Sequence, residues 1–324
     1  MRVLVTGIDG FVGSHLADYL LGISRVELSG TILGDHPSAL LTVDPGKVLL
    51  HQVDLRKPEE IQGFLLAIRP ERIVHLAGQA FVPASIDDPL GTITTNLNGT
   101  ANLLEAARKM RDQSGYDPAI LVVSTGEVYG RAMGDALPVT EESPLRPATP
   151  YAVSKAAADM LGQSYRTAYG MKVLVARPYN HAGPRQSPSF VCSDFGRRFA
   201  QFARGLAEPE LKVGELRARR DFTDVRDVVR AYWMLLDRES NHSVFNVCSG
   251  VTHEIGEIVR LLEQASGIKA KIMPDPVRMR SYDLSVLSGS NSRLIETTGW
   301  SPGIPFHQTV RDVYAYWLAE LGQG

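Results

Sequence analysis

Thr6-Gly7-Ile8-Asp9-Gly10-Phe11-Val12-Gly13 is the stretch of this sequence that decides the fold. It follows the apolar run Val3-Leu4-Val5 and opens a helical pattern, so its glycines have GxxGxxG spacing in a strand–turn–helix context. Such glycines permit a tight bend, a close backbone approach to a pyrophosphate, and close packing of helix on strand. The alternative is an ordinary glycine-rich turn. Because a helix N-terminus also stabilises phosphate charge, we predict a dinucleotide site at Gly7, Gly10, Phe11, Val12 and Gly13.

Short apolar runs alternate with helical patterns through the first half of the chain. The predicted strands are Arg2–Thr6, Glu27–Ile32, Val48–Gln52, Arg72–Leu76, Ile120–Ser124 and Val173–Arg177. The predicted helices are Gly13–Leu21, Pro58–Ile68, Thr92–Met110 and Tyr151–Tyr169. Such alternation indicates a parallel sheet with helices on both faces. We therefore predict an α/β fold, a doubly wound parallel Rossmann sheet that binds its ligands at the carboxyl ends of the strands.

The pattern becomes irregular after Arg177. Three prolines and a glycine between Pro178 and Ser189 predict a loop. Further predicted elements are the helices Cys192–Arg204 and Val225–Leu236 and the strands Leu211–Val213 and Val244–Val247. The tail contains the further segments Ile255–Gln264, Asn291–Thr297 and Phe306–Leu318, with a predicted loop at Met273–Ser285. We expect a dinucleotide-binding domain at residues 1–177, with residues 225–250 packing back on it, and a smaller C-terminal α/β substrate-binding domain mainly at residues 178–324.

Composition limits the class of protein. The 324 residues with 44% hydrophobic content are enough for a large core and two domains. A net charge of −2 argues against a nucleic-acid or membrane-surface protein. No apolar run approaches the roughly 18–20 residues that span a bilayer, and the histidines show no metal-ligand spacing, so we expect no metal. Two cysteines, Cys192 and Cys248, predict free thiols in a reducing cytoplasm.

Tyr151-Ala152-Val153-Ser154-Lys155 places a phenol and an amine one helical turn apart on one face. A pair at this spacing often forms only a solvated helix face. A phenol with a pKa of about 10 is a poor catalyst at neutral pH, and an adjacent ammonium lowers that pKa. Ser124 and Thr125, at the end of the fifth predicted strand, would hydrogen-bond the same substrate oxygen. With the glycine loop, these residues predict hydride transfer at a carbonyl carbon, with Tyr151 as the acid and Lys155 holding a nicotinamide ribose.

The identity of the dinucleotide stays open. An acidic residue closing the second strand would favour NAD and an arginine would favour NADP, but an apolar pair stands there. Asp35 is a late candidate for the ribose, and His36 or Arg56 could reach a phosphate. We expect NADP or NAD, with a slight preference for NADPH.

Two other segments are expected to touch the cofactor. Asp54, beside Leu55, either contacts the adenine amine or caps the helix that starts at Pro58. Small residues after the fourth strand would let the backbone lie against the cofactor at Leu76 and Ala77, and we expect His75 to be a packed structural residue.

Glu127 stands where a carboxylate could remove a proton beside a C4 ketone and so begin a dehydration. That reaction also needs an acid for the departing C6 hydroxyl, and its natural place is position 126. Gly126 has no side chain, so the site has a candidate base for the dehydration but no acid at position 126. Glu127 could instead hydrogen-bond a sugar hydroxyl.

Further motifs resemble the nucleotide-sugar branch of the extended short-chain dehydrogenase/reductase family, nearly from end to end. They lie at residues 177–184 (RPYNHAGP), 220–227 (RDFTDVRD), 245–250 (FNVCSG), 289–291 (GSN) and 298–300 (TGW). The resemblance implies a GDP-linked sugar as substrate. Its binding residues would be Ser124, Thr125, Asn180, Arg185, Phe190, Val191, Asp194, Lys212, Val213, Arg220, Arg280 and Asp283, the last standing where the family usually has glutamate.

The resemblance implies an NAD(P)H-dependent reductase that converts GDP-4-keto-6-deoxy-D-mannose to GDP-D-rhamnose. The alternatives are a 4,6-dehydratase that retains its NAD(P), a 4-epimerase, and a non-enzymatic redox-sensing module on the same fold. Tyr151 with Lys155 counts against the module, and Gly126 counts against the dehydratase. Family analogy also implies a homodimer formed through the helices Thr92–Met110 and Tyr151–Tyr169.

Overall fold

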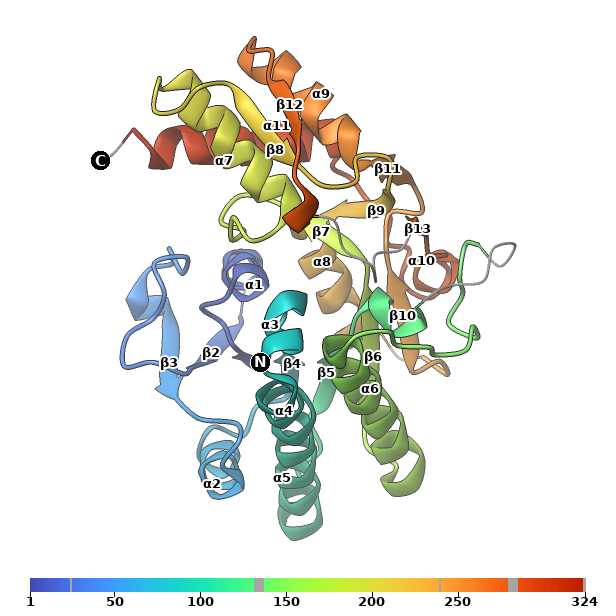
Figure 1. Ribbon diagram of the computed structural model, residues 1–324. Helices are drawn as coiled ribbons and strands as arrows, with labels where there is room; N and C mark the ends of the chain where they lie inside the picture. Colours follow the sequence, from blue (N-terminus) through green and yellow to red (C-terminus); the bar gives the residue numbers. More distant parts are fainter. Residues whose placement is uncertain (24, 131–136, 239, 279–284, 323–324) are drawn as a thin grey trace.

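The computed structural model describes residues 1–324 except 24, 131–136, 239, 279–284 and 323–324 (Figure 1). The strands are β1 (Arg2–Thr6), β2 (Glu27–Ile32), β3 (Val48–Gln52), β4 (Arg72–His75), β5 (Ala119–Val123), β6 (Val173–Pro178), β7 (Asn180–Ala182), β8 (Glu210–Val213), β9 (Arg219–Asp224), β10 (Val244–Val247), β11 (Thr252–Glu254), β12 (Lys271–Pro274) and β13 (Val286–Leu287).

The helices are α1 (Phe11–Leu21), α2 (Pro58–Ile68), α3 (Val82–Asp87), α4 (Pro89–Ile93), α5 (Gly99–Ser114), α6 (Pro150–Tyr169), α7 (Val191–Ala203), α8 (Val225–Leu236), α9 (Ile255–Ser266), α10 (Ser292–Thr298) and α11 (Phe306–Glu320). A π-helical turn, η2 (Thr94–Asn98), joins α4 to α5. Short 3-10 turns are η1 (Pro45–Lys47), η3 (Gly126–Tyr129) and η5 (Pro276–Arg278). No helix within these described ranges has the length and apolar character needed to cross a membrane.

Seven parallel strands form the central sheet in the order β10-β6-β5-β4-β1-β2-β3. The chain moves outward from β1 in both directions, so the strand order reverses between β1 and β4. Ligands of open α/β sheets bind at such a switch point, beyond the carboxyl ends of the strands. The predicted doubly wound Rossmann sheet is confirmed.

The two faces of this sheet are covered by different helices. Side chains alternate along a strand, so Val3 and Val5 of β1 join one buried cluster with α1 and α8. Leu4, between them, joins a second cluster with α2 and α5 on the other face. Burying one such side chain contributes roughly 1.5–3 kcal/mol. A slip of one residue would exchange the side chains that point to the two faces.

The second half of the chain both completes the sheet and builds a smaller unit. α8 packs beside α1, and β10 pairs with β6. Figure 1 shows α7, α9 and α11 gathered with β8 and β12 at the top of the view. These elements share a separate core that includes Phe195, Phe199 and Leu262. We keep the division of the chain near residue 177 as a proposal.

One predicted loop contains a strand. Residues 180–182 form β7, which pairs in parallel with β9. β9 also pairs with β11 and β13, so β7 joins a small sheet made from four distant segments. Sequence periodicity missed β7 because three residues among prolines carry no pattern, and the partner strand supplies the hydrogen bonds. β7 directly follows β6, which places this small sheet at the carboxyl end of the large one.

Candidate active site

The glycine loop between β1 and α1 is shaped for a close approach of another group. Gly7 has a φ of +66°, and a Cβ added to it would lie 3.0 Å from the Cα of Ala77. A Cβ on Gly13 would lie 2.3 Å from the carbonyl oxygen of Gly7, so both positions need glycine. α1 begins after Gly10 without a side-chain cap. Its first N–H groups therefore suit a pyrophosphate.

The end of β4 converges on this loop. The Oγ1 atom of Thr6 accepts hydrogen bonds from the backbone N–H groups of Leu76 and Ala77 at 3.1 and 3.2 Å. His75 is 3% exposed and is hydrogen-bonded to Thr6 and Thr100. The prediction that His75 is a packed structural residue is confirmed. The glycine loop and the segment at Leu76 and Ala77 therefore lie against each other, and this arrangement fits a dinucleotide.

The structure excludes one role proposed for Asp54. α2 has Lys57 as its N-cap and receives no side-chain cap, so Asp54 does not cap it. The Asp54 carboxylate instead accepts hydrogen bonds from Arg56, whose guanidinium holds the pKa of Asp54 at about 2. Both residues line a cavity of about 1000 Å³ together with Leu33. Leu55 is buried in the core beside it. The adenine role of Asp54 stays a prediction.

Two elements bring the predicted catalytic residues together. Thr149 caps α6, which starts at Pro150, so Tyr151 and Lys155 lie on its first two turns. Ser124 and Thr125 follow β5 directly and are buried. The Thr125 side chain lies close to the Tyr151 hydroxyl and lowers its pKa. The Lys155 amine lies 3.9 Å from the position that a Cβ on Gly78 would take, so it reaches the segment after β4.

The pKa values of Tyr151 and Lys155 differ from those expected for an isolated Tyr–Lys pair. Burial raises the pKa of Tyr151, the Glu127 carboxylate raises it further, and the nearby Thr125 side chain lowers it. Burial lowers the pKa of Lys155 to about 8. The predicted lowering of the Tyr151 pKa by Lys155 is therefore wrong for the protein alone. Desolvation outweighs the neighbouring ammonium, and Tyr151 is a neutral phenol that can donate a proton.

Asn96 is a site residue that the sequence reasoning missed. It is 1% exposed and lies in the π-helical turn η2. Its side chain accepts a hydrogen bond from the N–H of Gln79 and donates to the carbonyl of Gln79 and to Ser154. Asn96 thus ties the segment after β4 to α6. Its region has plain helical periodicity, so only the π turn, a frequent mark of functional sites, could have revealed it.

Position 126 is enclosed as well as small. A Cβ on Gly126 would lie 2.9–3.1 Å from the ring of Tyr179. Tyr179 is 3% exposed and packs near Tyr129, whose ring centroid is 6.5 Å away. The space beside Gly126 is therefore filled by an aromatic ring. Glu127 is half-buried, and its N–H donates to Thr125.

The predicted substrate residues divide into several groups. Asn180 on β7 and the buried Arg220 on β9 lie in the small sheet at the carboxyl end of β6. Val191 opens α7, and Lys212 is an exposed residue of β8.

The remaining predicted substrate residues have contacts of other kinds. Phe190 contacts Phe81 edge to face, with ring centroids 6.0 Å apart. Val213 is buried, and Asp194 forms ion pairs with Arg198 and Arg278. Arg280 and Asp283 lie outside the described residues.

Arg185 contacts two segments of the chain. Its guanidinium forms hydrogen bonds with His15 at 2.8 Å and with the Asp18 carboxylate at 2.5 Å, both on α1. It also donates to Leu40 and Thr42 in the segment after β2. Arg185 thus connects that segment to α1, and its expected place near the substrate stays a prediction.

Stability is expected to fall as pH falls below about 6.5. Burial lowers the pKa of His15 to about 4 and that of His75 to about 3. Unfolded histidine takes up a proton near pH 6.5. Between pH 6.5 and 4 the unfolded chain therefore binds more protons, which costs on the order of 2 kcal/mol per histidine by pH 5. Melting temperature measured from pH 7 to pH 5 should fall.

A histidine substitution separates this effect from general acid sensitivity. His75→Gln should flatten the decline, whereas replacing the exposed His36 by Gln should leave it unchanged. Equal slopes for all three proteins would contradict the assignment to buried neutral histidines.

A doubly wound sheet with a glycine loop at its switch point, and a Tyr–Lys pair on the helix beside it, defines an oxidoreductase of the short-chain dehydrogenase/reductase type. A model of the family described as GDP-mannose 4,6 dehydratase matches residues 4–313, and the chain belongs to this family. Among the residues that the structure describes, no group of acidic, histidine or cysteine side chains is arranged to hold a metal ion.

Individual relatives cover almost the whole chain. The GDP-6-deoxy-D-mannose reductase of Pseudomonas aeruginosa is 40% identical over 320 residues, which is 99% of this chain and 98% of its own. The solved structure of RMD from Pseudomonas aeruginosa complexed with NADPH has a TM-score of 0.84 at 37% identity and covers 98% of this chain and 99% of its own. The solved structure of a Thermus thermophilus UDP-glucose 4-epimerase in complex with NAD has a TM-score of 0.85 at 31% identity. It covers 98% of this chain and 99% of its own.

Proposed function

We propose that this protein reduces the C4 ketone of GDP-4-keto-6-deoxy-D-mannose to give GDP-D-rhamnose, with NADPH or NADH as the reductant. The observation that carries the proposal is the buried, neutral Tyr151 hydroxyl close to Thr125 at the carboxyl end of β5. The 40% identical GDP-6-deoxy-D-mannose reductase supports this choice of substrate.

The chain's own residues supply the proton and the orientation. When bound, the nicotinamide supplies a hydride to C4 of the sugar. Tyr151 donates its proton to the ketone oxygen, which becomes the new hydroxyl, so one hydride and one proton reduce the carbonyl. Thr125, which lies close to the Tyr151 hydroxyl, would hydrogen-bond it and orient it. Lys155 carries a positive charge below pH about 8, which stabilises the tyrosinate left after the transfer.

The region around Gly126 favours reduction over dehydration. A dehydratase must protonate the departing C6 hydroxyl, and Gly126 supplies no acid there. The ring of Tyr179 fills the adjacent space. Glu127 alone cannot complete an elimination, so we assign it to binding a sugar hydroxyl.

We also propose that the small sheet of β7 and β9 holds the GDP part of the substrate. Arg220 presents a guanidinium there, which suits a diphosphate, and Asn180 lies on the neighbouring strand. Val191 and Lys212 would contact the nucleoside. The two cysteines are free and buried, which supports work in a reducing cytoplasm.

The test offers the purified protein GDP-4-keto-6-deoxy-D-mannose with NADH and NADPH in separate reactions. We expect loss of reduced-nicotinamide absorbance with formation of GDP-D-rhamnose. GDP-mannose incubated alone should stay unchanged. A 4-keto-6-deoxy product from GDP-mannose would instead establish the dehydratase, and interconversion of 4-hydroxy epimers without net use of cofactor would establish the epimerase.

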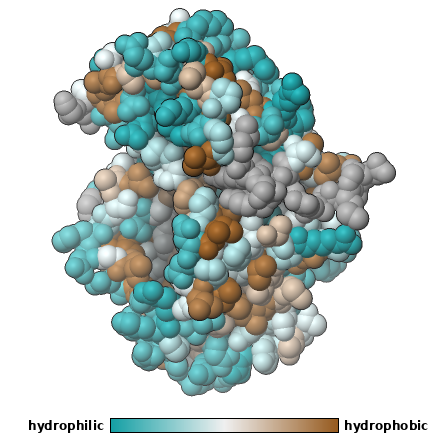
Figure 2. All heavy atoms as spheres, in the orientation of Figure 1, coloured by the Kyte–Doolittle hydropathy of each residue, from teal (hydrophilic) through white to brown (hydrophobic). Residues whose placement is uncertain are grey.

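We propose that the protein works as a homodimer. Val153 and Met160 lie on one face of α6 and are 45% and 61% exposed, and Leu90 on the adjacent α4 is 76% exposed. Figure 2 shows apolar surface over this part of the molecule. Large apolar side chains exposed side by side are typical of an interface. Pairing of this face with its own copy across a two-fold axis would cover it.

Replacing Met160 by Glu should convert the dimer to a monomer. A charge buried in an apolar interface costs several kcal/mol unless it is paired, so the mass in solution should fall by half. Light scattering coupled to size exclusion measures this mass. The matched control is Ile272→Glu, which adds the same charge at a partly exposed apolar residue of β12, away from α6. A wild-type protein that is already monomeric would contradict the proposal.

A further inference from the structure

The proposed catalytic groups lie on two separate elements. Thr125 and Glu127 belong to the turn that follows β5, whereas Tyr151 and Lys155 belong to α6. The direct contacts between these elements include the approach of the Thr125 side chain to the Tyr151 hydroxyl and a long hydrogen bond, at 3.4 Å, from the Ser124 hydroxyl to the Lys155 carbonyl. The first of these involves the hydroxyl that must turn to the substrate during reaction. A second connection has to hold the two elements in register.

Arg177 supplies that connection from β6. It is 3% exposed, and its guanidinium donates to both carboxylate oxygens of Asp159, at 2.7 and 3.1 Å. Asp159 is fully buried on α6, one turn beyond Lys155. A third hydrogen bond runs from Arg177 to the hydroxyl of Tyr129, at 2.8 Å. Tyr129 is the last residue of η3, the turn that carries Glu127.

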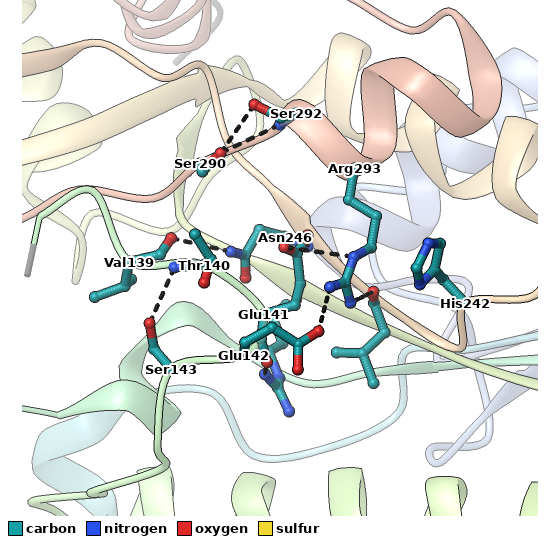
Figure 3. Close-up of polar contacts among 12 residues, drawn as sticks. Val139, Thr140, Glu141, Glu142, Ser143, His242, Asn246, Ser290, Ser292 and Arg293 are labelled. Carbon is teal, nitrogen blue, oxygen red and sulfur yellow. Dashed lines mark hydrogen bonds and ion pairs between the residues drawn. The ribbon is translucent and has the colours of Figure 1, made fainter.

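The network continues beyond Tyr129 and fixes its hydroxyl. That hydroxyl donates to the Oδ1 atom of Asn246 on β10 at 2.7 Å. Asn246 in turn donates to the carbonyl of Val139 and, through its backbone N–H, to the Glu141 carboxylate. Figure 3 shows Asn246 between these residues and Arg293, which also pairs with Glu141. The Tyr129 hydroxyl therefore has both a donor and an acceptor and cannot rotate freely.

Such an arrangement specifies position more than it adds stability. Taking an ion pair out of water costs about as much as the pair returns, so a buried pair is weak evidence for a role in stability. A planar guanidinium, by contrast, binds in a fixed fork geometry. Here the Nε and Nη2 atoms of Arg177 bind Asp159 on α6, and its Nη1 atom binds Tyr129 in the turn after β5. Catalytic groups have to stay within about 0.5 Å of their working geometry.

We propose that Arg177 is a positioning residue for ketone reduction, which holds α6 and the β5–η3 turn in register through Asp159 and Tyr129. The inference rests on the proposed function, because the groups that it positions are the acid and its partner. Loss of the connection should leave both ligands bound and slow the transfer. Misplacement by a fraction of an ångström lowers turnover without removing binding contacts.

Tyr129→Phe is the sharpest test, because it removes one oxygen and leaves the Arg177–Asp159 pair intact. We expect kcat to fall about tenfold, with KM for the nucleotide sugar and for NADPH within twofold of wild type. The matched control is Tyr165→Phe, which removes a hydroxyl near the far end of α6 that is hydrogen-bonded to Glu105 on α5. This control should keep the wild-type kcat, and both variants should melt at similar temperatures.

Arg177→Lys gives an independent test, since lysine keeps the charge beside Asp159 but cannot hold both partners. It should lower kcat as Tyr129→Phe does. If it fails to fold, Tyr129→Phe alone decides. A Tyr129→Phe kcat within twofold of wild type would overturn the inference. So would an equal loss in Tyr165→Phe, or a loss that matches the fraction of unfolded protein. If wild-type protein reduces no ketone in the same assay, the proposed function itself fails.

Discussion

Replacing Tyr151 by phenylalanine is expected to lower kcat by a factor of about 10² or more. Tyr151 is buried and lies close to Thr125, and we propose that it gives a proton to the ketone oxygen. Phenylalanine keeps the ring and its packing, so the fold and both binding sites should persist. Turnover of GDP-4-keto-6-deoxy-D-mannose with NADPH measures the loss, and titration with GDP measures the binding that remains.

The same substitution at Tyr169 provides the control. Tyr169 ends α6 and is 46% exposed, far along the helix from Tyr151. Tyr169→Phe should therefore have the turnover of wild type. If Tyr151→Phe also kept near-wild-type turnover, another group would have to be the acid.

Replacing Gly13 by alanine should raise KM for NADPH by at least about tenfold and lower the melting temperature. The new Cβ would lie 2.3 Å from the carbonyl oxygen of Gly7 and 2.6 Å from that of Ile8. Both are backbone atoms of the loop that cradles the cofactor, so the loop has to move. A displaced loop loses its hydrogen bonds to a pyrophosphate. Fluorescence titration with NADPH and thermal melting measure the two effects.

Gly63→Ala is the matched control, since it also adds one methyl group to a helix near the sheet. Gly63 lies within α2, and a Cβ there would meet nothing within 4 Å. Alanine at an open helical position stabilises by roughly 0.5–1 kcal/mol. The control should therefore keep its KM and melt at or above the wild-type temperature. An unchanged KM in Gly13→Ala would remove the loop from the cofactor site.

Local patterns predicted the central sheet because its order follows from short-range signals. β1, β2 and β3 have the predicted bounds, and α2 runs from Pro58 to Ile68 as expected. The apolar run of β1 is buried on both faces, and for this strand and its neighbours the length of the run and the flanking turns are enough to mark it. The small sheet was harder. β7, β11 and β13 have two or three residues each, and they are strands only because β9 lies between them.

The candidate site divides in the same way. Tyr151 and Lys155 could be predicted as a pair because one helical turn brings them together. Asn96 could not, because its role depends on a π turn and on partners at Gln79 and Ser154. Arg185 was expected near the substrate from its motif, and only the structure shows its hydrogen bonds with His15 and Asp18 of α1.

The amino-acid order by itself determined the glycine turn, the strand–helix alternation and the spacing of the phenol and the amine. These depend on backbone geometry over a few residues, which the local sequence controls. The tertiary structure alone decided the protonation of Tyr151 and the filling of the space beside Gly126 by Tyr179. It also decided the hydrogen bonds by which Arg177 connects Asp159 on α6 to Tyr129 on η3. Each of these depends on desolvation or contact between segments far apart in the chain. Only the folded chain brings those segments together and removes the water between them.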